Sequence, residues 1–109
     1  MSSAAESGTL HILVGPGELS WPAWLLPVLA RGDSVLLMQE AVWLALDGVA
    51  IAPARLGLPA GVSVYVLATD LQARGLSARA LNLGIQQIDD HGWVELSERH
   101  QRVLTWGGR

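Results

Sequence analysis

Short, nearly continuous runs of hydrophobic residues recur along the chain, and each is bounded by glycine, aspartate or proline. The clearest runs cover residues 10–14, 34–38 and 62–67. Strands of a parallel sheet that is covered on both faces have this pattern, because neither of their faces meets water. We therefore predict strands at these three positions, followed by a fourth over residues 83–88 and a last one over residues 103–106.

Helical patterns alternate with the predicted strands. Residues 20–32 begin with Ser20, which can cap a helix, and end with Gly32, which can terminate one, while Pro27 should kink the helix between them. Residues 39–46 predict a second helix, and its last six residues are all apolar. A helix that is apolar on every side is expected to be buried on every side.

The most regular helix signal follows the third strand. Residues 69–72 have the spacing of a capping box, Asp70 and Arg74 lie four positions apart, and Gly75 is a natural stop. We therefore predict a helix that ends at Gly75 and carries Asp70 and Arg74 as neighbours on its surface.

The remaining segments are assigned by their composition. Residues 1–8 are small and polar, which predicts a disordered lead-in, and residues 9–109 are assigned to one domain. Residues 47–61 are rich in glycine, proline and alanine and predict a loop. Residues 89–92 predict a turn, and residues 93–100 predict a short helix.

Alternating strands and helices predict an α/β sandwich with a mostly parallel sheet of about five strands. Ligands of such sheets bind beyond the carboxyl ends of the strands. Here that edge comprises residues 15–21, 38–42 and 68–71. The polar side chains that we expect there are Gln39, Glu40, Asp70 and Arg74.

The composition predicts contact with another protein rather than with nucleic acid or a membrane. Hydrophobic residues make up 50% of the chain and charged residues 16%, so some apolar surface should meet a partner. The net charge is −3, and the seven basic residues are scattered arginines, which argues against phosphate binding except at a local arginine such as Arg74 or Arg79. Charges interrupt every apolar run, and the start has no signal-peptide pattern, so we expect a cytoplasmic protein.

The chain contains no cysteine. This excludes disulfides, thiolate metal sites and any persulfide carried on these residues.

Several residue sets resemble catalytic or ligand sites only weakly. Residues 15–17 lie where a phosphate loop would, but they lack its remaining signature and predict a simple strand-to-helix turn. His11, inside an apolar strand, is expected to be a hydrogen-bonded core histidine. A metal cluster could be drawn from Asp89, Asp90, His91 and His100, but the two histidines lack the spacing of a helical ligand pair, and this segment is interpreted as a polar turn. A hydrolase triad would need the residue types of Ser97, His100 and an aspartate, but no G-x-S-x-G motif surrounds the serine.

The five tryptophans are candidates for both the core and an interface. We assign Trp93 and Trp106 to the core. Trp21, Trp24 and Trp43 lie in helical patterns that already have enough aliphatic residues for a core, so we predict that these three contact a partner.

The chain resembles the DsrH/TusB family over nearly its whole length from residue 9. The resemblance lies in the order and spacing of residues 9–13, 32–42, 64–76 and 88–96, together with Trp106. It implies a DsrE-like three-layer sandwich and membership in a heterohexamer with TusC/DsrF-like and TusD/DsrE-like subunits. In that family the complex passes persulfide sulfur from TusA-like donors to a TusE/DsrC-like acceptor.

The first predicted helix departs from the family pattern. DsrH proteins carry a cysteine there, whereas this chain has residues 24–27 without a thiol. The resemblance therefore implies a non-catalytic, TusB-like subunit without a cofactor. The interface candidates are Trp21, Trp24, Gln39, Glu40, Val42, Trp43 and Leu46.

Three alternatives remain open at this point. The pathway served is either tRNA wobble-uridine 2-thiolation or sulfur oxidation. The chain could instead be a stand-alone enzyme or small-ligand protein that uses the strand-end polar groups, or a diverged homologue whose pathway has changed.

Overall fold

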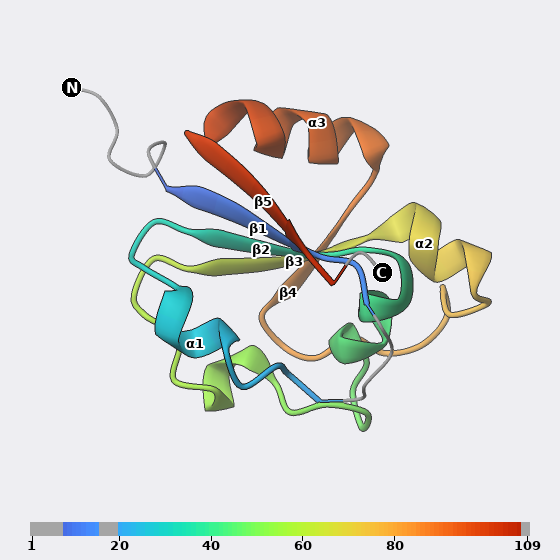
Figure 1. Ribbon diagram of the computed structural model, residues 1–109. Helices are drawn as coiled ribbons and strands as arrows, with labels where there is room; N and C mark the ends of the chain where they lie inside the picture. Colours follow the sequence, from blue (N-terminus) through green and yellow to red (C-terminus); the bar gives the residue numbers. More distant parts are fainter. Residues whose placement is uncertain (1–7, 16–19, 108–109) are drawn as a thin grey trace.

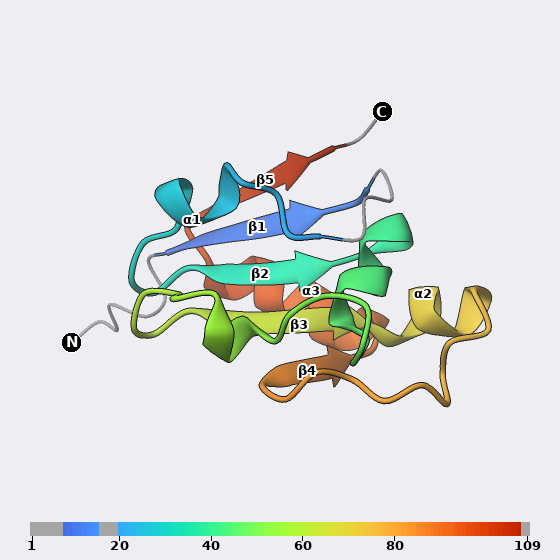
Figure 2. The same cartoon turned by 90° about the horizontal axis from the view of Figure 1, so that it is seen from below.

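A single five-stranded sheet organises the chain. The structure, a computed structural model, describes residues 8–15 and 20–107. Its strands are β1 (Thr9–Leu13), β2 (Ser34–Leu37), β3 (Ser63–Leu67), β4 (Ile85–Ile88) and β5 (Arg102–Trp106), in the order β4-β3-β2-β1-β5. Every pairing between them is parallel, which confirms the predicted α/β fold (Figures 1 and 2). Residues 1–7 of the predicted lead-in lie outside the described residues.

Helices cover both faces of the sheet, and one further helix lies beyond the carboxyl ends of the strands. The 3-10 helices η2 (Gln39–Ala45) and η3 (Pro53–Arg55) lie on the same face as α1 (Leu25–Val28), and α3 (Asp90–Arg99) covers the other face (Figure 1). The short α2 (Ala68–Ala73) lies beyond the carboxyl end of β3 (Figure 2). Within the described residues, no helix is long and apolar enough to cross a membrane.

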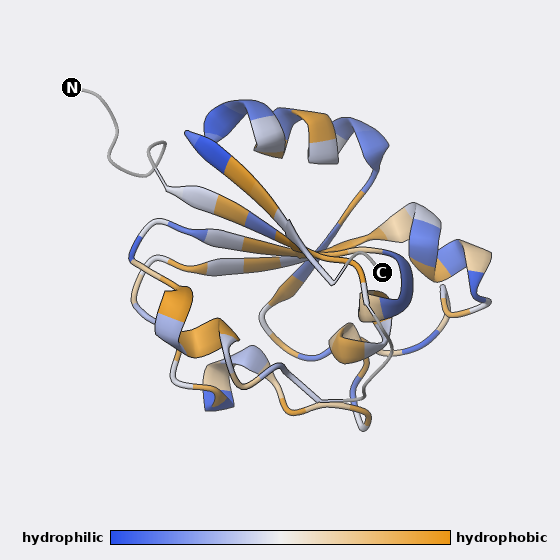
Figure 3. Cartoon of the chain, viewed as in Figure 1, coloured by the Kyte–Doolittle hydropathy of each residue, from blue (hydrophilic) through white to orange (hydrophobic). Residues whose placement is uncertain are grey.

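Both faces of the central strands are buried. In β2, Val35 and Leu37 belong to the cluster beneath α1 and η2, whereas Leu36 belongs to the cluster beneath α3. All three side chains are 0% exposed. Each such side chain contributes about 1.5–3 kcal/mol by leaving water. This double burial explains the continuous hydrophobic runs, which Figure 3 shows as orange bands on the sheet.

The predicted helix over residues 20–32 is wrong in length. Only the single turn Leu25–Val28 is helical, and Leu29 returns to an extended conformation. Pro27 lacks the N–H that a longer helix would need at that position, but it is tolerated within the first turn. The proline therefore limits the helix to one turn instead of kinking a long one.

The segment after β2 is helical, but in the tighter 3-10 form. Its apolar residues Ala41, Val42, Leu44 and Ala45 are buried, as predicted for this segment. Burial is not complete on every side, because Gln39 and Glu40 are exposed and Trp43 is half-buried. The predicted loop over residues 47–61 contains the single turn η3.

Two predicted helix starts are also corrected. The capping box of α2 does not form, because Thr69 donates to Asp90 and Asp70 accepts from the Gln39 N–H. The predicted turn over residues 89–92 is instead the start of α3, which Asp89 caps by accepting from Gly92 N–H at 2.8 Å. An aspartate in a turn and an aspartate at a helix N-cap give the same local sequence signal.

Candidate functional site

The predicted strand-end residues meet at the carboxyl edge of the sheet. Gln39 and Glu40 follow β2 directly, and Asp70 and Arg74 lie in and just after α2. Hydrogen bonds and ion pairs connect these four residues into one group, which we call the edge cluster. The sequence prediction placed all four residues at this edge, and the structure brings them together.

Gln39 has an unusual backbone conformation. Its φ is +52°, in the left-handed region that residues other than glycine adopt rarely. Its N–H donates to Asp70 Oδ2 over 2.6 Å. A charged acceptor strengthens such a bond and holds the residue in a conformation that costs about 1–2 kcal/mol. Asp70 therefore fixes the direction in which Gln39 and Glu40 leave the strand.

Arg74 joins Glu40 to α2. Its Nε and Nη2 both lie 3.0 Å from Glu40 Oε2, and its Nη1 donates to the Asp70 carbonyl at 3.1 Å and lies 3.9 Å from Asp70 Oδ1. The last contact confirms the predicted Asp70–Arg74 neighbourhood. The Glu40 side chain is 53% exposed, so it can still accept bonds from another molecule.

The edge cluster is suited to hydrogen bonding rather than to acid-base chemistry. Asp70 accepts from a backbone N–H and Glu40 accepts from a guanidinium, so the lone pairs in these contacts are not available to a substrate. A general base needs a substrate proton within reach and a free lone pair aimed at it. The arrangement instead presents a fixed, partly exposed pattern of donors and acceptors.

The three tryptophans that were predicted to contact a partner are placed differently from one another. Trp24 is 39% exposed, and the centroid of its ring lies 4.6 Å from the centroid of the Trp106 ring. Trp21 is half-buried and donates its indole N–H to the Ile51 carbonyl at 2.9 Å. Trp43 is half-buried and packs against the main core cluster. Trp24 thus offers more surface to a partner than either of the other two.

Two further interface candidates have no exposed surface. Val42 and Leu46 are both 0% exposed, and their side chains belong to the core beneath the sheet. They can influence a partner only through the position of η2. Trp93 and Trp106, assigned to the core from the sequence, are half-buried and pack against the two core clusters.

A pocket of about 380 Å³ opens beside the Trp24–Trp106 pair. It lies at the carboxyl ends of β1 and β5, where parallel sheets commonly hold ligands. Its described lining consists of Leu13, Gly15, Ser20, Pro22, Trp24, Ala41, Leu44, Trp106 and Gly107. These groups are mostly apolar, and none is a nucleophile or a metal ligand beyond the Ser20 hydroxyl.

The weak catalytic and metal patterns are not assembled into sites. Among the described residues, no group of three or more histidine, cysteine or acidic side chains could hold a metal ion. Ser97 donates to the Trp93 carbonyl at 3.0 Å, and His100 bonds to Leu96 and Ser34 instead of to Ser97. Pro16 and Gly17 of the phosphate-loop-like segment lie outside the described residues.

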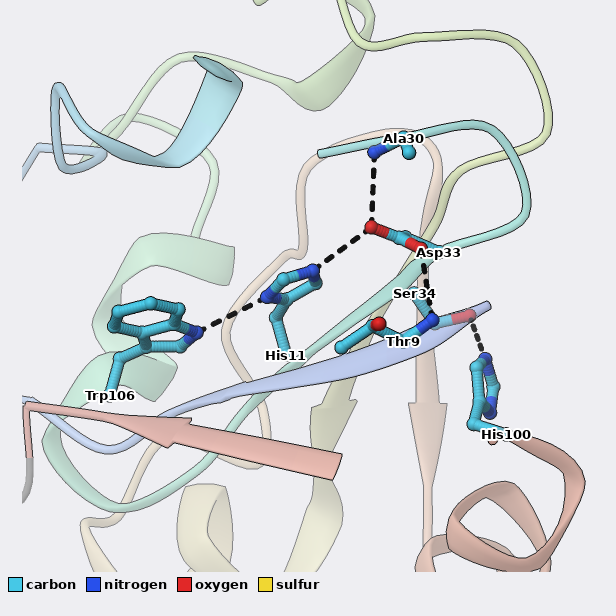
Figure 4. Close-up of polar contacts among 7 residues, drawn as sticks. All are labelled: Thr9, His11, Ala30, Asp33, Ser34, His100 and Trp106. Carbon is cyan, nitrogen blue, oxygen red and sulfur yellow. Dashed lines mark hydrogen bonds and ion pairs between the residues drawn. The ribbon is translucent and has the colours of Figure 1, made fainter. Parts of the chain in front are cut away.

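His11 and Asp33 form a buried polar network beneath the sheet (Figure 4). The two residues are 3% and 5% exposed, and His11 Nε2 lies 3.0 Å from Asp33 Oδ2. Asp33 also accepts the N–H groups of Thr9 at 2.9 Å and Ala30 at 3.0 Å. On its other side, His11 Nδ1 accepts the Trp106 indole N–H at 3.2 Å. His11 is therefore a hydrogen-bonded core histidine, as predicted.

The carboxyl of Asp33 is held in its charged form. Burial raises its pKa, but the hydrogen bonds from Thr9, Ala30 and His11 outweigh this effect and lower the pKa below the ordinary value of 3.8. The carboxylate ties β1 to the turn that leads into β2. Its role is structural.

Several of these residues give little signal in the sequence. Asp33 precedes a strand, as many turn residues do, and only the structure shows that it accepts three hydrogen bonds. Asn82 is 6% exposed and donates to the carbonyls of Leu46 and Ala50, which fixes the loop after η2. In the sequence, the position of Asn82 between two leucines was the hint of its burial. The following residue, Leu83, is instead 85% exposed.

Comparison with known proteins gives one family. Residues 19–103 match the family model described as DsrH like protein. TusB of Serratia proteamaculans (strain 568) is 37% identical over 91 residues, which cover 84% of this chain and 92% of that protein. TusB of Shigella flexneri is 37% identical over 97 residues, covering 89% and 99% respectively. TusB of Erwinia tasmaniensis is 40% identical over 86 residues, covering 75% and 83%.

The fold and the site define a small α/β protein with a parallel sheet, a polar edge cluster and exposed aromatic surface, and with no thiol among its 109 residues. Together with the family match and the relatives, this settles the classification. The chain belongs to the DsrH/TusB family of sulfur-relay subunits.

Proposed function

We propose that this chain is a non-catalytic subunit of a TusBCD/DsrEFH-like complex that supports persulfide transfer for 2-thiolation of the tRNA wobble uridine. Its partners would be TusC/DsrF-like and TusD/DsrE-like subunits, with TusA-like and TusE/DsrC-like carriers acting on the complex in the cytoplasm. The observation that carries the proposal is the absence of cysteine from the 109 residues. Persulfide chemistry requires a thiolate, so a sister subunit must supply it.

The exposed aromatic surface supports a role in assembly. Trp24, which directly precedes α1, is 39% exposed, and Leu26 and Val28 within α1 are 38% and 42% exposed. Tryptophan contributes more to interface affinity than most residue types because it buries a large, rigid surface. We assign these exposed residues in and beside α1, with the half-buried Trp21 and Trp43, to contacts with the sister subunits.

The edge cluster supports a second, polar contact. Glu40 is exposed, and Gln39 is held in a fixed left-handed conformation by Asp70. A preorganised polar group loses little freedom on binding, which favours specific recognition. We assign Gln39 and Glu40 to orienting a sister subunit, with Asp70 and Arg74 holding them in place.

A pull-down tests the assembly role. The chain would be co-expressed with the two candidate sister subunits and captured through a tag within residues 1–8. We expect both sisters to be retained by the natural chain, and Trp24→Ala to lower their retention at least severalfold. Arg74→Ala should also weaken retention, whereas Arg79→Ala, at an exposed arginine outside the edge cluster, should not. Equal retention by all variants would contradict the assigned surface.

The cellular readout tests the pathway. Deleting the gene in its host should abolish 2-thiouridine in digested tRNA, measured by mass spectrometry, and the natural chain supplied on a plasmid should restore it. A complex that forms normally while tRNA thiolation is unchanged by the deletion would reject the tRNA pathway. Loss of sulfur oxidation in the same strain would then assign the complex to that pathway.

A further inference from the structure

The bond between Trp106 and His11 determines which His11 nitrogen carries the proton. The Trp106 indole is a donor only, and it lies 3.2 Å from His11 Nδ1, so that nitrogen must offer a lone pair. A neutral imidazole with an unprotonated Nδ1 has its proton on Nε2. That proton points at Asp33 Oδ2, 3.0 Å away (Figure 4).

The same bond cannot survive protonation of the ring. An imidazolium has an N–H on both nitrogens and accepts no hydrogen bond. The half-buried indole N–H would then face a second N–H instead of an acceptor, so this hydrogen bond would be lost. The contact with Asp33 does not change in the same way, because Nε2 carries a proton in both ring states and can donate to Oδ2 over 3.0 Å.

The other charged groups around the sheet do not contact His11 in the described residues. Arg31 and Arg102 lie on the neighbouring turn and strand and are exposed. Glu40, on η2, is paired with Arg74. His100 lies at the end of α3, beyond the opposite face, where it donates to the Leu96 carbonyl and accepts from the Ser34 hydroxyl. Within the described residues, Asp33 and the Trp106 indole are therefore the polar groups that contact the His11 ring.

The position of Trp106 matters for the molecular surface. Its ring packs on Trp24 at 4.6 Å, and both rings line the pocket at the carboxyl ends of β1 and β5. A change at buried His11 would thus be transmitted through Trp106 to an exposed aromatic residue. The path consists of one hydrogen bond and one ring contact.

We propose that His11 is a proton-sensitive latch on Trp106: the neutral ring holds the indole through Nδ1, and a proton gained at Nδ1 releases it and loosens the Trp24–Trp106 wall of the pocket. The latch follows from the geometry of this chain alone and does not depend on the sulfur-relay role.

Nitrogen NMR of the full-length chain tests the resting state, in the complex with its sister subunits if the chain requires them for solubility. The chain has three histidines, so the variants His91→Gln and His100→Gln assign the ring signals. At neutral pH we expect His11 to carry its proton on Nε2. A ring protonated on Nδ1, or on both nitrogens, would overturn the proposal.

A pH titration of the indole N–H signals tests the latch itself. We expect the Trp106 signal to change together with protonation of His11, while the Trp21 signal, bonded to the Ile51 carbonyl, stays constant as an internal control. A Trp106 indole signal that stays unchanged while His11 is protonated would contradict the latch. So would a His11 ring that stays neutral until the chain unfolds.

The variant Trp106→Phe provides the reciprocal test, because phenylalanine retains ring packing but has no N–H. Without the donor, His11 should bind a proton roughly tenfold more tightly, so its transition moves to higher pH. An unchanged transition would overturn the proposal. If the variant does not fold, the titration of the natural chain decides the question alone.

Discussion

Asp33 receives more buried hydrogen bonds than any other side chain described here. It accepts from Thr9, Ala30 and His11 while being 5% exposed. Replacing it with asparagine puts an amide donor where three donors already point. We expect Asp33→Asn to lower the free energy of unfolding by about 2–4 kcal/mol, measured by urea denaturation. Asp47→Asn, at an exposed aspartate, should change it by less than about 0.5 kcal/mol.

The pH dependence of stability follows from the same carboxylate. Its pKa in the folded chain is lowered below 3.8, so the unfolded chain binds the proton more tightly. The stabilisation is therefore fully present above about pH 5 and is lost as pH falls through 3.8 toward the folded-state pKa. Urea midpoints between pH 6 and pH 3 should fall in the natural chain and fall less in Asp33→Asn. Parallel curves for the two chains would contradict this account.

Gln39 is the residue at which local strain is measurable. Its φ of +52° suits glycine better than glutamine. We expect Gln39→Gly to raise the free energy of unfolding by about 0.5–1 kcal/mol, even if the variant binds sister subunits less well. Gln72→Gly, at an exposed glutamine inside α2, should instead lower it by about 1 kcal/mol. A similar loss in both variants would show that Gln39 is not strained.

At the scale of elements, the strands could be predicted from the sequence and most helix boundaries could not. Most positions on both faces of β1, β2 and β3 are buried, so burial dictates the residue type along most of each strand. The helices are short and their limits depend on single contacts. Pro27 restricts α1 to one turn, and Asp70 bonds to Gln39 instead of capping α2. Such tertiary bonds leave no periodic signal.

The start of α3 gives a test at this scale. Asp89 accepts the Gly92 N–H at 2.8 Å and satisfies a donor that the helix itself leaves free. Asp89→Ala should lower the free energy of unfolding by about 1 kcal/mol. Glu98→Ala, an exposed position within the same helix, is the control and should have little effect. Equal effects would mean that the cap does not stabilise α3.

The edge cluster was partly predictable because parallel strands place their carboxyl ends together. Gln39, Glu40, Asp70 and Arg74 were expected at this edge, but their pairing depends on the left-handed turn at Gln39. The contact between Trp24 and Trp106 was not predicted, since β5 reaches β1 only after α3 has crossed the whole sheet. Long-range neighbours of this kind follow from strand order rather than from local pattern.

On the scale of the whole molecule, the chain has a positive mean hydropathy and exposes several large apolar residues. The mean hydropathy is +0.34, and several large apolar residues are at least 38% exposed. They are Trp24, Leu26, Val28, Ile51, Leu83, Val94 and Val103. A solitary domain of this size would gain solubility by replacing them, whereas a subunit gains affinity by keeping them. We propose that these residues contact sister subunits.

The most direct test of this account is the molar mass, by light scattering, of the material purified after co-expression with the two candidate sister subunits. We predict a stable species that contains three different chains, with the reactive thiol on a sister subunit, and poor behaviour of this chain when expressed alone. A stable 11.6 kDa monomer that binds neither sister subunit would contradict the subunit role. It would favour instead a small-ligand protein that uses the pocket beside Trp24 and Trp106.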